Sequence, residues 1–198
     1  MDFDKKKIGK LFNLGGEHVV YNYNGEQVIK FPNILAKILF NNRKLAEKKQ
    51  ADLKICQEYF SEYLLTTEFL AEPAKRRPYG LIQPRVVVRP LSIKDLKNNE
   101  LRDNFFRILK INNKLKEKHR LSFDFLGAWR LVFNWLLPTE HLSNLMVNEN
   151  NEIIILDIVF LEYQKSWSKL LLWISRWAEK KQQRVIKKFI NYARRVSF

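Results

Sequence analysis

The sequence predicts an α+β fold divided into two lobes, and three observations indicate it. Residues 8–31 contain three strand-like runs, residues 34–64 carry a helical pattern, and the second half is mainly helical around one short hairpin. Strands that come first and helices that follow, without regular alternation, are typical of α+β proteins. We expect a first lobe over residues 1–83, with a small antiparallel sheet and one long helix, and a second lobe over residues 84–198.

The first lobe is predicted to begin with two hairpins. "KLFNL" leads into Gly15-Gly16, "EHVVYNY" alternates apolar and polar residues, and Asn24-Gly25 separates that run from "EQVIKF". Asn-Gly between alternating runs is a strong hairpin signal, because both turn residues adopt positive φ. Lys30 is therefore expected on the third strand. "TTEFLAE" and "YGLIQPRVVV" are predicted as further strands around the basic turn 75–78.

The second lobe is predicted to be mainly helical. Ser92, with Asp95 three residues later, has the pattern of a helix N-cap. An amphipathic helix is expected over 101–118, and the apolar run 122–137 is expected to be buried. Two short strands, "NLMVN" and "IIILD", surround the polar turn 149–151, and a basic, Trp-rich helical segment spans 166–196.

Composition and charge limit the function classes. The chain has 198 residues, 46% of them apolar, and Cys56 is its one cysteine, so an intramolecular disulfide is excluded. A charged N-terminus without an apolar run behind it, and apolar stretches shorter than a membrane span, predict a soluble cytoplasmic protein. The net charge is +15, and the basic C-terminal segment either favours an anionic partner, such as nucleic acid, a membrane surface or a phosphorylated substrate, or is a solvated helix face.

The hairpin near the end of the second lobe carries the most informative motif. In "LPTEHLSNLMVNENNEIIILD", Asn144 begins one predicted strand and Asp157 ends the next. An Asp directly after an apolar strand is costly to bury without a partner, which favours a ligand role. Mg²⁺ prefers oxygen ligands and keeps several waters, so one carboxylate, one amide oxygen and phosphates are sufficient to hold it.

With this motif, residues 8–160 resemble the protein-kinase-like superfamily, especially its small bacterial and aminoglycoside-phosphotransferase-like branch. The resemblance implies a two-lobed kinase-like fold that binds ATP and Mg²⁺. It implies that the Gly15-Gly16 turn covers the nucleotide phosphates and that Lys30 binds phosphate. A helix Glu would orient Lys30. Glu47 is preferred by its spacing, and Glu58 is the alternative.

The same resemblance assigns the remaining site residues. Gln83 lies where the interlobe hinge would bind adenine through its backbone, and Asn144 and Asp157 would hold Mg²⁺. The family's catalytic Asp falls on Thr139, which cannot accept a proton at neutral pH. The neighbouring Glu140 and His141 are the candidate bases.

Two function classes follow from this resemblance. One is an ATP- and Mg²⁺-dependent phosphotransferase whose acceptor is unknown. The other is an inactive pseudokinase that acts as a regulatory or interaction module. A basic nucleic-acid-binding protein ranks third, because the aromatic residues occupy core-like positions and not an exposed stacking array.

The C-terminal segment leaves two alternatives open. After the degenerate loop, its Trp- and Lys-rich sequence is similar to the PhoP-regulatory-network (YrbL-type) proteins and comparable to lipopolysaccharide-core sugar kinases. Residues 164–198 contain ten Lys or Arg and a single acid, Glu179. The apolar stripe of this segment either packs onto the larger lobe or forms an amphipathic surface that meets anionic lipid at a membrane periphery.

Overall fold

The chain has an α+β fold with mostly antiparallel strands. The computed structural model describes residues 3–14, 18–33, 42–74, 77–127, 140–162 and 169–197. Within these ranges it contains three α-helices and strands in three sheets. It forms two compact units, one made of Met1–Glu58 and Leu64–Val86 and the other of Tyr59–Tyr63 and Val87–Phe198. The division expected from the sequence, after residue 83, lies close to the change of unit after Val86.

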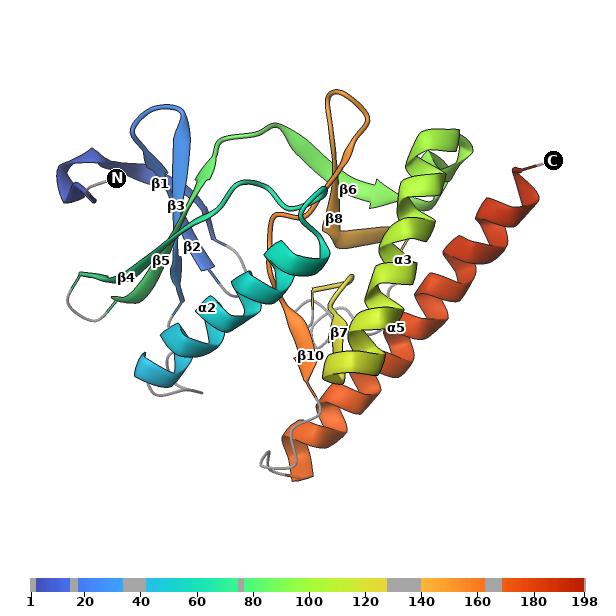
Figure 1. Cartoon of the computed structure of the whole chain (residues 1–198). Coiled ribbons are helices and arrows are strands. Elements are labelled where there is room, and N and C mark those ends of the chain that lie inside the picture. The colour runs from blue at the N-terminus through green and yellow to red at the C-terminus, as the bar shows by residue number, and fades with distance from the viewer. Residues whose placement is uncertain are drawn as a thin grey trace. The chain divides into compact units, whose positions relative to one another are not determined.

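The first unit is built on a five-stranded sheet of order β1-β2-β3-β5-β4 (Figure 1). Its strands are β1 (Ile8–Leu14), β2 (His18–Tyr23), β3 (Gln27–Pro32), β4 (Glu68–Ala74) and β5 (Arg77–Pro84), and all neighbours are antiparallel. The β2–β3 turn has a φ of 53° at Asn24 and 77° at Gly25. These positive angles confirm the predicted Asn-Gly hairpin, and β1, β2 and β3 confirm the three predicted strands.

The two faces of this sheet carry separate apolar clusters. On one face, Tyr79 and Leu81 pack with Leu45 of α2 (Asn42–Tyr59). On the other face, Tyr23, Ile29, Phe31 and Ile82 form a second cluster. The predicted helix over 34–64 thus contains α2, while residues 34–41 lie outside the described part of the chain.

The second unit contains the other two sheets and two long helices. Its strands are β6 (Val88–Ser92), β7 (Leu121–Phe123), β8 (His141–Asn148), β9 (Ile153–Ile154) and β10 (Phe160–Glu162). They pair as β6-β8-β9 and as β10-β7. The β8–β9 hairpin confirms the two short strands expected around the polar turn.

Local capping explains where the helices of this unit begin. Ser92 and Asp95 form a capping box at the 3₁₀ helix η2 (Ile93–Lys97), which confirms the predicted N-cap. The Asn98 side chain then caps α3 (Asn99–His119) by accepting from the N–H groups of Glu100 and Leu101. Arg120 ends α3 in the left-handed conformation.

One predicted strand is wrong in its extent. "YGLIQPRVVV" was expected as a single strand, but β5 ends at Pro84 and β6 begins at Val88 in a different sheet. Pro84 has no N–H with which to extend a strand ladder. The Arg85 N–H still donates to the carbonyl oxygen of Glu26, its opposite residue in the β3–β5 register, but Glu26 already belongs to the β2–β3 turn, so β3 offers no further partner.

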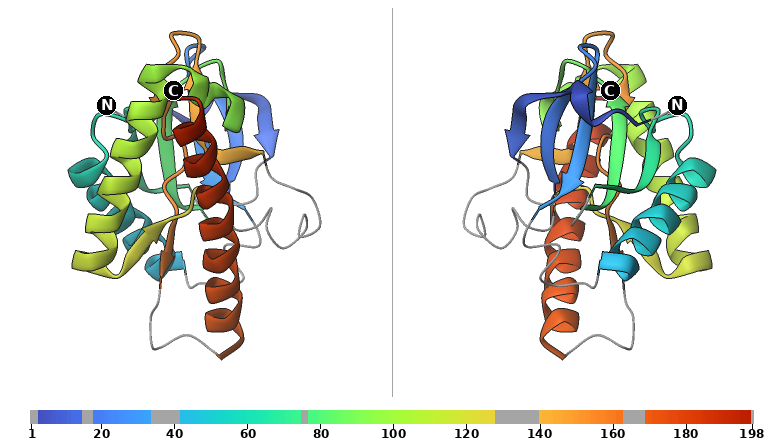
Figure 2. Two further views of the ribbon diagram at one scale, coloured as in Figure 1. Left: turned by 90° about the vertical axis from the view of Figure 1, so that its right-hand side faces the viewer. Right: turned by 90° about the vertical axis from the view of Figure 1, so that its left-hand side faces the viewer.

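The C-terminal helix α5 (Lys169–Arg195) packs its apolar stripe into the second unit. Ala178, Val185, Phe189 and Ala193 are buried, and the Phe189 ring lies 5.8 Å from that of Phe105 on α3. Figure 2 shows α5 as one unbroken helix from both sides. From residue 176 onward, where the side chains of α5 are described, the apolar stripe is therefore part of the core. This agrees with the first sequence alternative, in which the stripe packs onto the larger lobe.

No helix among the described residues is long and apolar enough to cross a membrane.

Candidate functional site

The second unit holds a buried carboxylate in a tight loop directly after β7. Asp124 is fully buried, and its backbone N–H donates to the Val159 carbonyl oxygen at 2.9 Å, just before β10. Its side-chain Oδ1 accepts from the N–H groups of Leu126 at 3.0 Å and Gly127 at 2.9 Å. Gly127 has a φ of 77°, which L side chains rarely adopt. The sequence Asp-Phe-Leu-Gly thus closes a loop around its own carboxylate.

Asn144, in the middle of β8, is bonded to this loop twice. Its Nδ2 donates to the Asp124 carbonyl oxygen at 2.7 Å, and its backbone N–H donates to the Phe125 carbonyl oxygen at 3.2 Å. Because Nδ2 is used in this way, the orientation of the amide is fixed and its acceptor atom, Oδ1, faces away from that carbonyl. Within the described residues Oδ1 accepts no hydrogen bond. An amide oxygen held in this way is suited to binding a hard cation.

Gly127 lies next to that oxygen. A Cβ at this position would lie 3.6 Å from Asn144 Oδ1, which is ordinary contact distance. A methyl group would therefore fit but would contact Oδ1. The positive φ is the reason for glycine at this position.

Two helices hold the residues that flank Asp124. Asn112 of α3 accepts from the Phe123 N–H at 2.7 Å. Gln182 of α5 accepts from the Phe125 N–H at 2.9 Å and donates to the Phe123 carbonyl oxygen at 2.8 Å. Both amide side chains are buried. Asn112 and Gln182 are positioning residues for the loop, since they fix its backbone and not the carboxylate itself.

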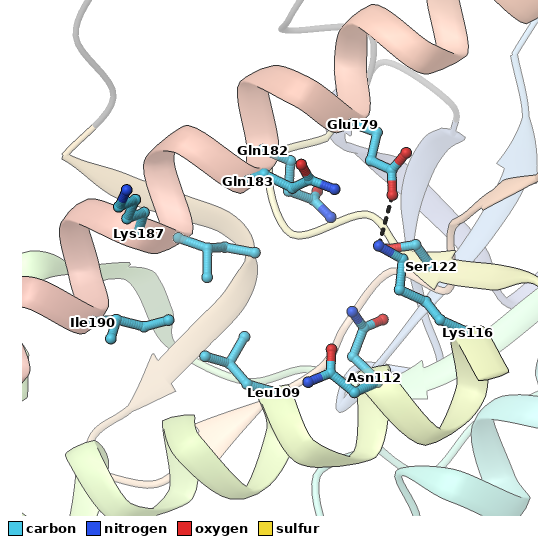
Figure 3. Close-up of a pocket in the computed structure, with 11 residues that line it drawn as sticks. Leu109, Asn112, Lys116, Ser122, Glu179, Gln182, Gln183, Lys187 and Ile190 are labelled. Atoms are coloured by element: carbon cyan, nitrogen blue, oxygen red, sulfur yellow. Dashed lines mark hydrogen bonds and ion pairs between the residues drawn. The ribbon is translucent and has the colours of Figure 1, made fainter.

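These bracing amides line a groove between α3 and α5 (Figure 3). The groove has a volume of about 270 Å³, and Asn112, Ser122 and Gln182 border it where it meets β7. An ion pair of 2.6 Å between Lys116 Nζ and Glu179 Oε1 joins the two helices beside it. The groove therefore belongs to the support of the Asp124 loop.

Asp157 follows the β8–β9 hairpin, but β9 ends at Ile154 and not at Asp157 as predicted. Asn144 lies within β8 and not at its start, and its backbone N–H donates to the Phe125 carbonyl oxygen and not across the hairpin. Asp157 is half-buried, between the fully buried Ile155 and Ile158. The described residues contain no group of three or more His, Cys, Asp or Glu side chains able to hold a metal. Asn144 and Asp157 would thus need oxygens from a ligand to complete an Mg²⁺ shell, a donor set that suits this cation.

In the first unit, the structure places Lys30 on β3 with only 7% of its surface exposed. Lys30 lies opposite Val20 and Leu81, on the face of the sheet that α2 covers. Gln83 is also buried, and its Nε2 donates to Thr67 Oγ1 at 2.8 Å. The Gln83 side chain is thus engaged within the sheet, in keeping with a predicted role that uses the backbone alone.

Glu47, the helix carboxylate predicted to orient Lys30, lies on the exposed side of α2, whereas Lys30 is buried. The Glu47 side chain is 61% exposed and forms an ion pair with Arg43 at 2.9 Å. Glu58 is exposed as well. The buried carboxylate of α2 is Asp52, which pairs with Lys48 at 2.8 Å.

The two candidate bases lie at the start of β8 and are exposed to solvent. Glu140 and His141 are exposed, with His141 opposite Ser92 in the β6–β8 ladder and the Glu140 carbonyl oxygen accepting from Ile93. Gly15, Gly16 and Thr139 lie outside the described residues. The acid that the structure brings to Asn144 is Asp124, which the sequence reasoning missed because it searched for an acid a few residues before Asn144.

Cys56 is the one nucleophilic thiol in the chain, and it is buried in α2. Burial raises the pKa of this thiol to about 12. It therefore stays protonated at neutral pH, and a cysteine-based reaction is not supported.

Comparison with known proteins leaves the chemistry to be inferred from these side chains. No protein-family model matches the chain, and no curated protein matches it either.

Proposed function

We propose that the protein is a kinase-like phosphotransferase that uses ATP and Mg²⁺, with Asp124 in place of the acid that appeared to be missing at Thr139. The observation that carries this proposal is the bond from Asn144 Nδ2 to the Asp124 carbonyl oxygen, 2.7 Å long. It brings a carboxylate residue and a metal-binding amide together although they are 20 residues apart in the chain. Asp157 follows the same hairpin as Asn144.

In this proposal each residue has a distinct role. Asn144 Oδ1 and Asp157 would hold Mg²⁺, which would supply positive charge to neutralise the phosphates. Lys30 is the phosphate-binding cation, and its burial on a rigid strand would keep that charge fixed. The acceptor hydroxyl attacks the γ-phosphorus and the bond to the β–γ bridging oxygen breaks, so that ADP leaves with the electron pair. The hydroxyl proton passes to Asp124.

A second candidate, a pseudokinase, is favoured by one specific observation. Asp124 is fully buried, and its Oδ1 already accepts two backbone N–H groups. A carboxylate engaged in this way can serve to shape the loop without taking part in catalysis. The protein would then bind nucleotide, or a partner, without turnover.

Ligand-induced stabilisation tests the binding part of the proposal. ATP and Mg²⁺ together at about 100 times the dissociation constant should stabilise the fold by roughly 2.7 kcal/mol, which corresponds to about 5–11 °C in the unfolding midpoint for a chain of this size. We expect Lys30→Ala and Asp157→Asn to lose this shift. The exposed Asp103→Asn on α3 is the matched control and should keep it. If ATP and Mg²⁺ do not shift the unfolding midpoint of the wild-type protein, both the phosphotransferase and a nucleotide-binding pseudokinase are contradicted.

Turnover separates the enzyme from the pseudokinase. Asp124→Asn is the sharpest variant because an amide oxygen can still accept from Leu126 and Gly127 while it cannot take a proton. In an enzyme, this variant should keep the ATP-dependent shift and lose at least about 100-fold in phosphate release or transfer. If wild type binds ATP with Mg²⁺ but turns over no faster than Asp124→Asn, the pseudokinase is the correct assignment.

A further inference from the structure

The edge strand β1 carries an unusual concentration of exposed apolar side chains. Leu11, Phe12 and Leu14 are 57%, 47% and 70% exposed, and Val87 is the other exposed large hydrophobic residue among those described. β1 is the outermost strand of its sheet on one side, so no strand covers its outer edge (Figure 1). Single exposed apolar residues need no explanation, but a cluster of them on a short element indicates an interaction surface.

The strand register shows that two of these side chains share one face. Leu11 lies opposite Tyr21, and Leu14 lies opposite Val19. Residues opposite each other in a ladder point to the same side, and residues two apart on β2 also share a side. Leu11 and Leu14 therefore project from the same face. It is the face of the Ile29–Phe31 cluster, opposite to the face on which α2 packs.

Exposed basic residues precede β1 and lie within it, and an arginine lies beside Phe12. Lys5, Lys6 and Lys7 form the short helix η1 (Lys5–Lys7) that leads into β1, and Lys10 lies within the strand; all four are exposed. The guanidinium of Arg85 lies 5.2 Å from the centre of the Phe12 ring. The neighbouring acid Asp4 is engaged as the N-cap of η1, with its carboxylate accepting from the Lys6 N–H. Exposed apolar side chains on a strand that also carries and follows exposed lysines match the interface of an anionic bilayer.

The geometry of β1 argues against a peptide strand as the partner. Its pairing with β2 shifts register between Ile8 and Leu11 and again between Leu11 and Asn13. Such irregularities, together with edge lysines, are the features that protect an edge from strand addition. A second copy of the chain would bring the same lysines face to face, each chain having a net charge of +15.

We propose that β1 and η1 dock the protein on an anionic lipid surface. Leu11 and Leu14 enter the boundary between headgroups and acyl chains, while Lys5, Lys6, Lys7 and Lys10 bind the anionic headgroups. This docking surface lies in the first unit and does not rest on the phosphotransferase proposal. It assigns the membrane contact to β1 and η1 and not to α5, whose described apolar stripe is buried within the second unit.

Vesicle sedimentation of the full chain is the first test. We expect binding to phosphatidylcholine vesicles that contain about one-third phosphatidylserine, and little binding to phosphatidylcholine alone. Raising the salt from about 0.1 M to about 0.5 M should weaken binding strongly, because the Debye length shortens. No binding to the anionic vesicles at the lower salt would overturn the proposal.

Matched variants then locate the contact. Leu11→Ser with Leu14→Ser should weaken vesicle binding by about tenfold or more, whereas Val87→Ser, which is 70% exposed like Leu14, should leave it unchanged. Lys5, Lys6 and Lys7 changed together to Gln should cost roughly 100-fold, about fivefold for each lysine. All of these residues are exposed, so the variants should fold normally.

Removing positive charge from α5 tests whether vesicles bind to that helix and not to β1 and η1. Arg184, Lys187 and Lys188 are also exposed, and their joint change to Gln removes the same charge as the η1 variant. The proposal requires the α5 variant to retain most of its vesicle binding. Loss of binding in the α5 variant with retention in the β1 and η1 variants would overturn it. Binding to soluble poly-glutamate without binding to vesicles would equally overturn it and would make the partner an acidic polypeptide.

Discussion

Asp124 and Asp157 both follow a short strand in the second unit, yet their environments differ. Asp124 is fully buried and its Oδ1 accepts from two backbone N–H groups of its own loop. Asp157 is only half-buried, between two buried isoleucines. A carboxylate that satisfies buried backbone donors has a structural task whatever else it does. A half-buried carboxylate is still partly accessible to solvent. The two acids therefore differ in burial, one being enclosed by its own loop and the other partly exposed.

The largest expected effect is on stability when each acid is removed. Asp124→Ala leaves the N–H groups of Leu126 and Gly127 without their acceptor, which should cost about 2–5 kcal/mol of unfolding free energy. Asp157→Ala should cost only about 1 kcal/mol, because a half-buried group can be rehydrated. Urea denaturation of both variants measures the difference. Equal costs would break the distinction between the two acids.

Removing the brace from α5 should have the next largest effect. Gln182→Met keeps the length of the side chain but loses its bonds to the Phe123 carbonyl and the Phe125 N–H, at a cost of about 2–4 kcal/mol. Hydrogen exchange should become faster in residues 121–127. Gln183→Met, at the exposed neighbouring position, is the control and should change neither quantity. An unchanged exchange rate in Gln182→Met would show that the loop does not depend on α5.

The smallest expected effect comes from adding one methyl group at a glycine. Gly127 and Gly25 both have a φ of 77°, so alanine at either position should cost about 1–2 kcal/mol. Only at Gly127 does the new Cβ meet Asn144 Oδ1, since nothing lies within 4 Å at Gly25. Gly127→Ala should therefore weaken the ATP- and Mg²⁺-dependent shift in unfolding temperature, and Gly25→Ala should not. Equal loss of the shift in both variants would point to general destabilisation.

Much of the fold follows from local sequence signals. Asn24-Gly25 specified a hairpin, Ser92 with Asp95 specified a helix start, and alternating apolar runs specified the strands of the first unit. These signals work because the turn angles and caps depend on residues a few positions apart. The same local reasoning failed where "YGLIQPRVVV" continues across Pro84, because pairing partners and not strand propensity decide where that strand ends.

The candidate site was less predictable, because contacts between residues far apart in the sequence bring it together. Asp157 could be found because an acid after "IIIL" contrasts with its neighbours. Asp124 offers a similar contrast between Phe123 and Phe125, with a glycine three residues later, but only the structure joins it to Asn144. Gln182 was missed because a polar residue within an apolar helical stripe has no motif. Its position among the buried residues of that stripe was the available signal.

Because Gln182 of α5 braces the Asp124 loop, the loop can be completed only after α5 has been synthesised. Gln182 reaches Phe123 and Phe125 over sequence separations of 59 and 57 residues. Such long-range contacts form late, because loop closure must be paid for before they can stabilise anything. On the ribosome, residues 121–127 therefore emerge well before the helix that fixes them. The nascent chain can carry a finished β1–β2–β3 sheet while its Asp124 loop remains incomplete, so assembly of the candidate site should be among the last steps of folding.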